Sequence, residues 1–146
     1  MEKINEIPAD KVVITVETSI NAPIEKVWNC WTLPEHITNW NHASDDWHCP
    51  AAENDLRPGG KFSYTMAAKD GSFSFDFSGV HTAITLQHNI NTILDDGRKM
   101  EVTFEEKDGK TKVVESFEAE DINTIELQKG GWQAILDNFK KHTEAS

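Results

Sequence analysis

The sequence of residues 61–77 is KFSYTMAAKDGSFSFDF, and this stretch decides the fold class. Apolar and polar residues alternate on both sides of Asp70-Gly71, a dipeptide typical of tight hairpin turns. A period of two places alternate side chains on one face of a β-strand. The stretch therefore predicts an antiparallel hairpin with one aromatic face. The residues that share this face are Phe62, Tyr64 and Met66 on the first strand and Phe73, Phe75 and Phe77 on the second.

The chain after this hairpin continues as short alternating strands separated by turns. Gly79 is predicted to mark a bulge or bend, because the alternation slips to Val80 and beyond. This slip leaves open which face of the sheet carries His81. Further strands are predicted over 89–94, about 100–104 and about 113–117, with turns at Asp96-Gly97 and Asp108-Gly109. Together these strands form an antiparallel meander.

The segments before the hairpin predict one strand and two short helices. Residues 12–20 are rich in β-branched side chains, which favour a strand. Asn21 can cap a following helix and Pro23 suits its first turn. Pro34 ends that helix and starts a second one. The polar residues 41–54 predict a loop, with a strand from about Asp46 onward.

The C-terminal segment predicts one long amphipathic helix. Its apolar stripe consists of Ile125, Gln128, Trp132, Ile135, Leu136 and Phe139. Gly130-Gly131 lies inside this helix, where each glycine costs about 1 kcal/mol relative to alanine. We therefore expect a close backbone approach or a kink at the glycine pair.

This order of elements indicates an α+β fold of one domain over residues 1–146, with a core over about 11–143. The apolar stripe of the long helix and the aromatic face of the sheet must be buried against each other. A strongly curved antiparallel sheet of about six or seven strands that grips the helix satisfies both. Such an arrangement usually leaves space between sheet and helix, where small ligands bind.

Charge and composition exclude several classes of partner. The formal net charge is −11, which opposes binding to nucleic acid phosphates and to anionic membranes. No stretch approaches the roughly 20 apolar residues that cross a bilayer. The first residues lack the layout of an export signal, so we expect a cytoplasmic protein with Cys30 and Cys49 reduced. We also expect a monomer.

Four motifs resemble one protein superfamily. They are INAPIEKVW at 20–28, LRPGGKF at 56–62, DDGR at 95–98 and GGWQAILDNF at 130–139. The first resembles the strand-to-helix entry of the START-like, birch-allergen-like (SRPBCC) superfamily, and the next two resemble its hairpins. The last is similar to the final helix of one branch, the homologues of the C-terminal domain of the heat-shock-protein-90 ATPase activator. The resemblance covers about residues 11–143.

The resemblance implies the helix-grip fold and a central cavity for lipids, polyketides, flavonoid-like aromatics or hormones. It does not imply catalysis, because the catalytic residues of the few enzymes in the superfamily vary. It also makes a chaperone a possible partner. The chain does not include the separate N-terminal domain with which the eukaryotic activator grips the chaperone, so ATPase activation is not expected from the family name alone.

The candidate ligand-binding residues are mainly aromatic. They are Trp28, Phe62, Tyr64, Met66, Phe73, Phe75, Phe77, His81, Trp132, Leu136 and Phe139. Aromatic stripes can line a cavity or simply fill a core, and the resemblance favours the cavity. A lone histidine in a strand is more often structural than catalytic, and no serine–histidine or cysteine–histidine motif accompanies His81. We therefore expect no catalytic residue.

One loop collects possible metal ligands. These residues are His42, Asp45, Asp46, His48 and Cys49. Their spacing matches no standard site, and no second cluster would complete a closed shell of ligands. We therefore expect no metal and no cofactor.

Three hypotheses of function follow from these observations. The leading one is a carrier or sensor that binds a small hydrophobic ligand without catalysis. The second is an enzyme such as a polyketide cyclase or dehydratase, which requires an acid–base group in the cavity. The third is a chaperone-interacting module, which requires an exposed apolar patch.

Overall fold

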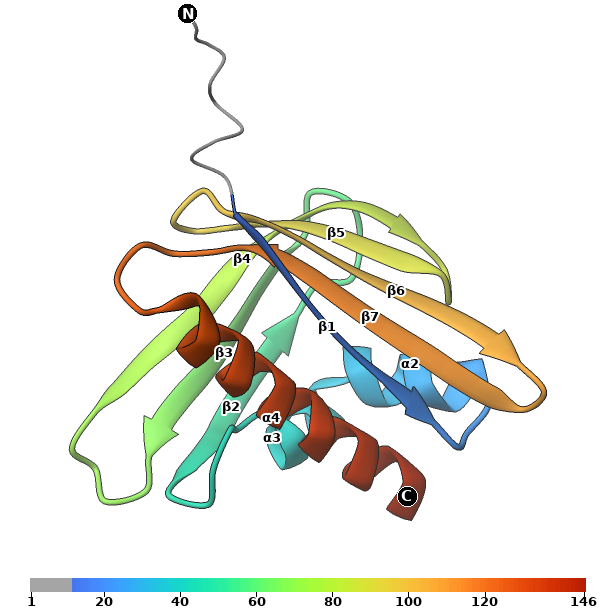
Figure 1. Ribbon diagram of the computed structural model, residues 1–146, viewed down its shortest axis with the longest axis horizontal. Helices are drawn as coiled ribbons and strands as arrows, with labels where there is room; N and C mark the ends of the chain where they lie inside the picture. Colours follow the sequence, from blue (N-terminus) through green and yellow to red (C-terminus); the bar gives the residue numbers. More distant parts are fainter. Residues whose placement is uncertain (1–11) are drawn as a thin grey trace, which may run out of the picture.

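The computed structural model describes residues 12–146, which form seven strands and three helices (Figure 1). The strands are β1 (Val13–Ile20), β2 (Trp47–Asn54), β3 (Lys61–Ala68), β4 (Ser74–Thr85), β5 (Asn89–Leu94), β6 (Lys99–Lys107) and β7 (Lys110–Glu118). The helices are α2 (Ile24–Thr32), α3 (Pro34–Trp40) and α4 (Ile125–Ala145). The predicted order of elements is confirmed. Residues 1–11, on which the expectation of no export signal depends, lie outside the described residues.

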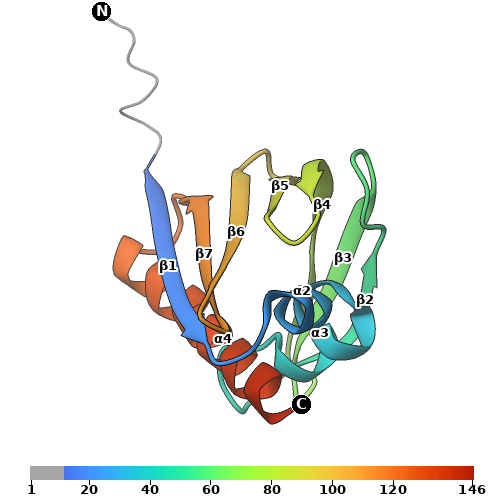
Figure 2. The same cartoon turned by 90° about the vertical axis from the view of Figure 1, so that its right-hand side faces the viewer.

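All seven strands belong to one antiparallel sheet with the order β1-β7-β6-β5-β4-β3-β2. The sheet curls into a half-barrel, and the three helices lie across its open side (Figure 2). Helix α4 packs on β1, while α3 packs on β2 and both short helices contact α4. The predicted α+β helix-grip fold is therefore confirmed. Within residues 12–146 no helix has the length and apolar character needed to span a membrane.

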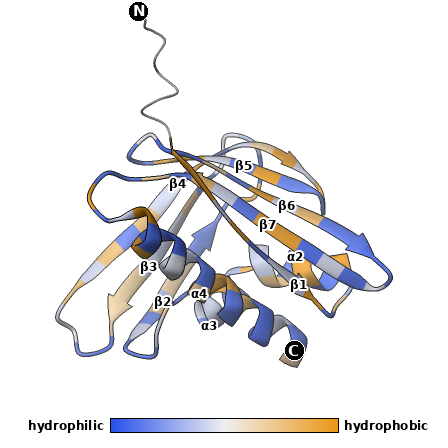
Figure 3. Cartoon of the chain, in the orientation of Figure 1, coloured by the Kyte–Doolittle hydropathy of each residue, from blue (hydrophilic) through white to orange (hydrophobic). Residues whose placement is uncertain are grey.

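Alternation along the strands determines which residues form the core. Hydrophobic and hydrophilic residues alternate along β6 and β7 (Figure 3). Thr111, Val113, Glu115 and Phe117 of β7 are all buried, and the residues between them are more exposed. The inner face of β7 thus points toward the helices.

The turn into β7 follows the predicted chemistry, because Asp108 and Gly109 have φ values of 57° and 78°, as in a type I′ turn.

The predicted bulge at Gly79 is wrong. Gly79 pairs regularly with Phe62 on β3 and with Leu94 on β5, and the register shift falls between His81 and Ala83 instead. A Cβ atom on Gly79 would lie 2.5 Å from the carbonyl oxygen of Ile93, so close strand approach explains this glycine. Because the alternation is intact as far as His81, that side chain lies on the same face as Phe77.

Two expectations about the helices also require correction. Pro23, not Asn21, is the N-cap of α2, and it makes no side-chain cap. The free backbone N–H of Ile24 instead donates to Oε1 of Glu106 on β6 at 2.8 Å. Helix α4 runs without interruption, and a Cβ atom on Gly130 or Gly131 would meet nothing within 4 Å, so no close approach occurs there.

Candidate functional site

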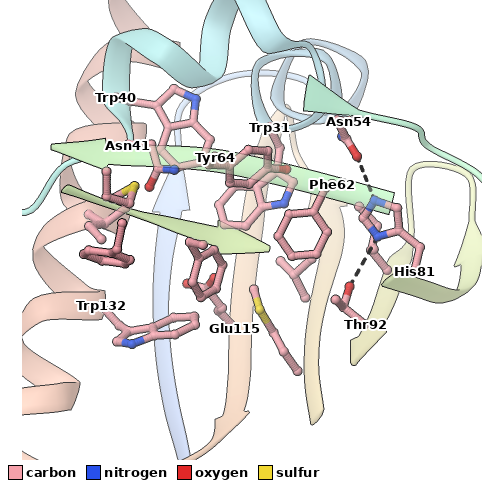
Figure 4. A pocket seen from close by; sticks show the side chains of 17 residues that line it. Trp31, Trp40, Asn41, Asn54, Phe62, Tyr64, His81, Thr92, Glu115 and Trp132 are labelled. Atoms are coloured by element: carbon pink, nitrogen blue, oxygen red, sulfur yellow. Dashed lines mark hydrogen bonds between the residues drawn. The ribbon is translucent and has the colours of Figure 1, made fainter. Parts of the chain in front are cut away.

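An apolar cavity of about 190 Å³ lies between the concave face of the sheet and the helices (Figure 4). Seven of the predicted ligand-binding residues line it. They are Phe62, Tyr64 and Met66 on β3, Phe75, Phe77 and His81 on β4, and Trp132 on α4. The hairpin quoted at the outset therefore forms one wall, and Trp132 faces it with its ring edge-on to Phe77 at 5.7 Å.

The other four predicted residues do not line the cavity. Trp28 packs edge-on against Phe104, and Leu136 is fully buried in the core. Phe139 contacts the rings of Trp31 and Trp40, each at 4.9 Å, because the C-terminal half of α4 packs on the short helices. Phe73 precedes β4 and is 58% exposed.

The cavity reaches the surface beside the start of β4. Phe75 lines the cavity and is also 46% exposed, so its ring lies at the opening. Phe73 and Trp47 extend this rim, with ring centroids 5.9 Å and 6.2 Å from that of Phe75. An exposed aromatic rim gives an apolar ligand a place to leave water before it enters.

Ten lining residues are not among the ligand-binding residues that the sequence predicts. The apolar ones are Trp31, Trp40, Ile90, Met100, Val102 and Ile135, and the polar ones are Asn41, Asn54, Thr92 and Glu115. The apolar residues of the strands occupy inward positions of the predicted alternation. The signal for Glu115 was also present, because it alternates with Val113 and Phe117 on one strand face.

His81 is held in a complete chain of hydrogen bonds at one end of the cavity (Figure 4). Its Nε2 lies 2.7 Å from Oδ1 of Asn54, and its Nδ1 lies 3.3 Å from the hydroxyl of Thr92. The amide nitrogen of Asn54 donates in turn to the backbone carbonyl of Thr32. Burial lowers the pKa of His81. A neutral imidazole that donates from Nε2 and accepts at Nδ1 satisfies both contacts, which is a structural role.

Glu115 differs from His81 in having no partner. Glu115 is 5% exposed, and within the described residues no hydrogen bond or ion pair reaches its carboxyl group. Burial away from water raises the pKa of Glu115 to about 8. The carboxyl group is therefore mostly neutral at pH 7 and able to donate a hydrogen bond.

Tyr64 also lines the cavity and carries a phenol hydroxyl group. Burial raises the pKa of its phenol above the ordinary value, so the group stays protonated. Burial likewise raises the pKa of the neighbouring Cys49 thiol, which contacts the backbone carbonyl of Ala51 at 3.4 Å. A protonated thiol is a poor nucleophile, and Cys49 is not among the described residues that line the cavity.

The polar loop at 42–49 does not bring its possible metal ligands together. Within residues 12–146, the one group of three convergent ligand atoms comes from Cys30, His36 and His142. These atoms lie within 4.8 Å of one another, and Nδ1 of His36 is 2.9 Å from Nε2 of His142. The two imidazoles satisfy each other through this hydrogen bond, with one as donor and the other as acceptor.

Comparison with known families places this site in context. The profile described as activator of Hsp90 ATPase homolog 1-like protein (AHSA1) matches residues 21–144. The chain belongs to this AHSA1 family. The match includes every strand that lines the cavity and nearly all of α4, so the predicted resemblance is confirmed. A search of curated proteins finds no match.

Solved structures support the same assignment. The AHSA1-like protein from Aeromonas hydrophila is 45% identical, with a TM-score of 0.86 over 92% of this chain and 93% of that one. A protein from Cytophaga hutchinsonii is 52% identical, with a TM-score of 0.79 over 90% and 92% of the two chains. A protein from Chromobacterium violaceum has a TM-score of 0.82 over 91% and 98%, and at 19% identity it shows the fold alone.

Proposed function

We propose that this AHSA1-family protein binds a small, mainly aromatic molecule in the central cavity and acts as a carrier or sensor without catalysis. The observation that carries the proposal is an apolar cavity bounded by Trp132 on the helix and Phe77 on the sheet. Well-formed apolar cavities with a few polar groups are the usual sites of small ligands.

The size of the cavity restricts the ligand. Its volume of about 190 Å³ is below the roughly 300–1,000 Å³ of sites for drug-sized ligands. A molecule of one or two rings fits this space better than a long acyl chain. Rings on the helices, such as Trp31 and Trp40, provide faces and edges against which such a molecule can stack.

A cavity-filling substitution tests the proposal with naphthylethanol as a neutral two-ring probe. Ile135 on α4 lines the cavity, so Ile135→Phe adds apolar volume there while it keeps the helix intact. We expect calorimetry to show at least about tenfold weaker binding, because the ligand and the larger side chain compete for one space. Ile125→Phe is the matched control, since Ile125 is 41% exposed on the same helix and does not line the cavity. Equal binding by wild type and Ile135→Phe would place the probe elsewhere.

Acid–base catalysis on the bound molecule is a second candidate function, favoured by the buried carboxyl group of Glu115. Its pKa of about 8 lies close to ambient pH, as the pKa values of general acids and bases often do. Mass spectrometry tests this function by showing whether a compound that binds in the cavity is chemically altered after incubation with the protein. A product formed by the wild type and not by Glu115→Gln is expected of an enzyme, whereas an unchanged compound is expected of a carrier.

A further inference from the structure

Glu115 is surrounded by apolar side chains in every direction along the sheet. Val16 on β1 and Val102 on β6 are its paired neighbours across the sheet. Val113 and Phe117 flank it on the same face of β7, and Trp132 stacks on Phe117 with ring centroids 3.7 Å apart. An acid at this position gains nothing from its own chain.

An unpartnered buried carboxyl group destabilises the fold, which points to a use other than stability. The same cavity holds a histidine whose two ring nitrogens both have partners, so the interior is able to satisfy polar groups elsewhere. Glu115 also lines the cavity itself rather than the packed core. We therefore expect the bound ligand to supply the polar group that pairs with the carboxyl group of Glu115.

The charges around the cavity select the kind of partner. Its described lining contains no lysine or arginine, and its titratable groups besides Glu115 are Tyr64 on β3 and His81 on β4. An anionic ligand would find no counter-charge there and would also face the formal net charge of −11. A cation would gain both an acid and the faces of aromatic rings such as those of Trp31 and Trp132.

We propose that Glu115 binds the basic nitrogen of the ligand, so that the cavity selects a small aromatic molecule that carries one amine. The inference rests on the proposed function, since it names the chemical class of the ligand of the same cavity. The final state is an ion pair between ammonium and carboxylate. A neutral amine reaches this state by taking the proton of Glu115, and an ammonium ion reaches it when that proton leaves for solvent.

This proton balance makes amine binding depend on pH. The pKa of Glu115 is about 8 in the empty cavity, so an ammonium ligand must displace a proton at pH 7. Burial lowers the pKa of His81 and raises that of Tyr64, so it favours the uncharged form of both facing groups. We expect the affinity for the amine to rise by up to about tenfold per pH unit between roughly pH 6 and pH 8. The affinity for a neutral analogue stays flat.

Calorimetry with three probes on one naphthalene skeleton tests the inference. The probes are naphthylethylamine, naphthylethanol and naphthylacetate. We expect the amine to bind at least about tenfold more tightly than the alcohol, and the acetate to bind most weakly. Glu115→Gln should bring the affinity for the amine to that of the alcohol, with the alcohol itself changed by less than about threefold. Glu105→Gln is the matched control, because it makes the same side-chain change at an exposed position of β6.

The outcomes separate this inference from the proposed function. Equal binding of the amine and the alcohol, or strongest binding of the acetate, overturns the role of Glu115 and leaves a cavity ligand in place. Binding of none of the three probes contradicts the proposed function itself. The pH dependence in the wild type needs no variant, so a flat amine profile overturns the inference even where Glu115→Gln fails to fold.

Discussion

Removal of the charge at Glu115 is expected to stabilise the protein in alkaline solution. Burial raises the pKa of this carboxyl group from its ordinary value of 4.5 to about 8. Below pH 4.5 the group is neutral in both the folded and the unfolded chain. As the pH rises from 4.5 to about 8 the unfolded chain loses this proton and the folded chain retains it, so the wild type loses stability over this window.

The magnitude follows from the width of that window. At about 1.4 kcal/mol per pH unit, the rise from 4.5 to about 8 corresponds to on the order of 5 kcal/mol. Between about pH 5 and about pH 8.5 the wild type should lose roughly 4 kcal/mol relative to Glu115→Gln. The glutamine has its own burial cost, but that cost does not change with pH.

Urea unfolding at these two pH values measures the difference. The quantity to compare is the gap in the free energy of unfolding between Glu115→Gln and the wild type, and Glu105→Gln provides the same side-chain change at an exposed position. The gap should widen in favour of Glu115→Gln at the higher pH. A gap that stays constant within about 0.5 kcal/mol would refute the reasoning that Glu115 is buried without a partner.

Three further substitutions test the packing by urea unfolding near neutral pH. Gly131→Ala should raise the free energy of unfolding by about 1 kcal/mol, because its Cβ meets nothing in α4, and a loss of stability would indicate a contact there. Gly79→Ala should lower it by at least about 2 kcal/mol, because the new Cβ would lie 2.5 Å from the carbonyl oxygen of Ile93; a neutral effect would contradict that close approach. Asn54→Ala should lower it by about 1–3 kcal/mol, since it leaves Nε2 of His81 without an acceptor, and no change would indicate that water replaces the amide.

Much of the fold follows from local patterns in the sequence. The alternation in β3 directs Phe62, Tyr64 and Met66 inward, as the structure confirms. Pro34 begins α3 as expected because proline tolerates the first turn of a helix and not its interior. The side chain of Thr124 caps α4 by accepting a hydrogen bond from the backbone N–H of Leu127. Threonine is one of the residue types that favour the N-cap position.

The errors arise where one residue type serves two physical needs. A glycine in a strand marks either a bulge or a close approach, and only the paired strands distinguish the two at Gly79. Trp132 and Phe139 share the apolar stripe of α4, but Trp132 lines the cavity and Phe139 packs on the short helices. The sequence pattern of α4 alone cannot distinguish these two environments, because they depend on where the short helices lie. Glu115 was not singled out because composition favours the surface for an acid, although the alternation of β7 places it inside.

The indole N–H signals of the five tryptophans test most directly whether the cavity binds a small aromatic molecule. Trp31, Trp40 and Trp132 line the cavity, whereas Trp28 is buried beside Phe104 and outside it. In a two-dimensional NMR titration with naphthylethanol, the signals of the three lining tryptophans should shift and that of Trp28 should stay in place. Unchanged signals at saturating probe, or shifts confined to tryptophans outside the cavity, would contradict the proposed site.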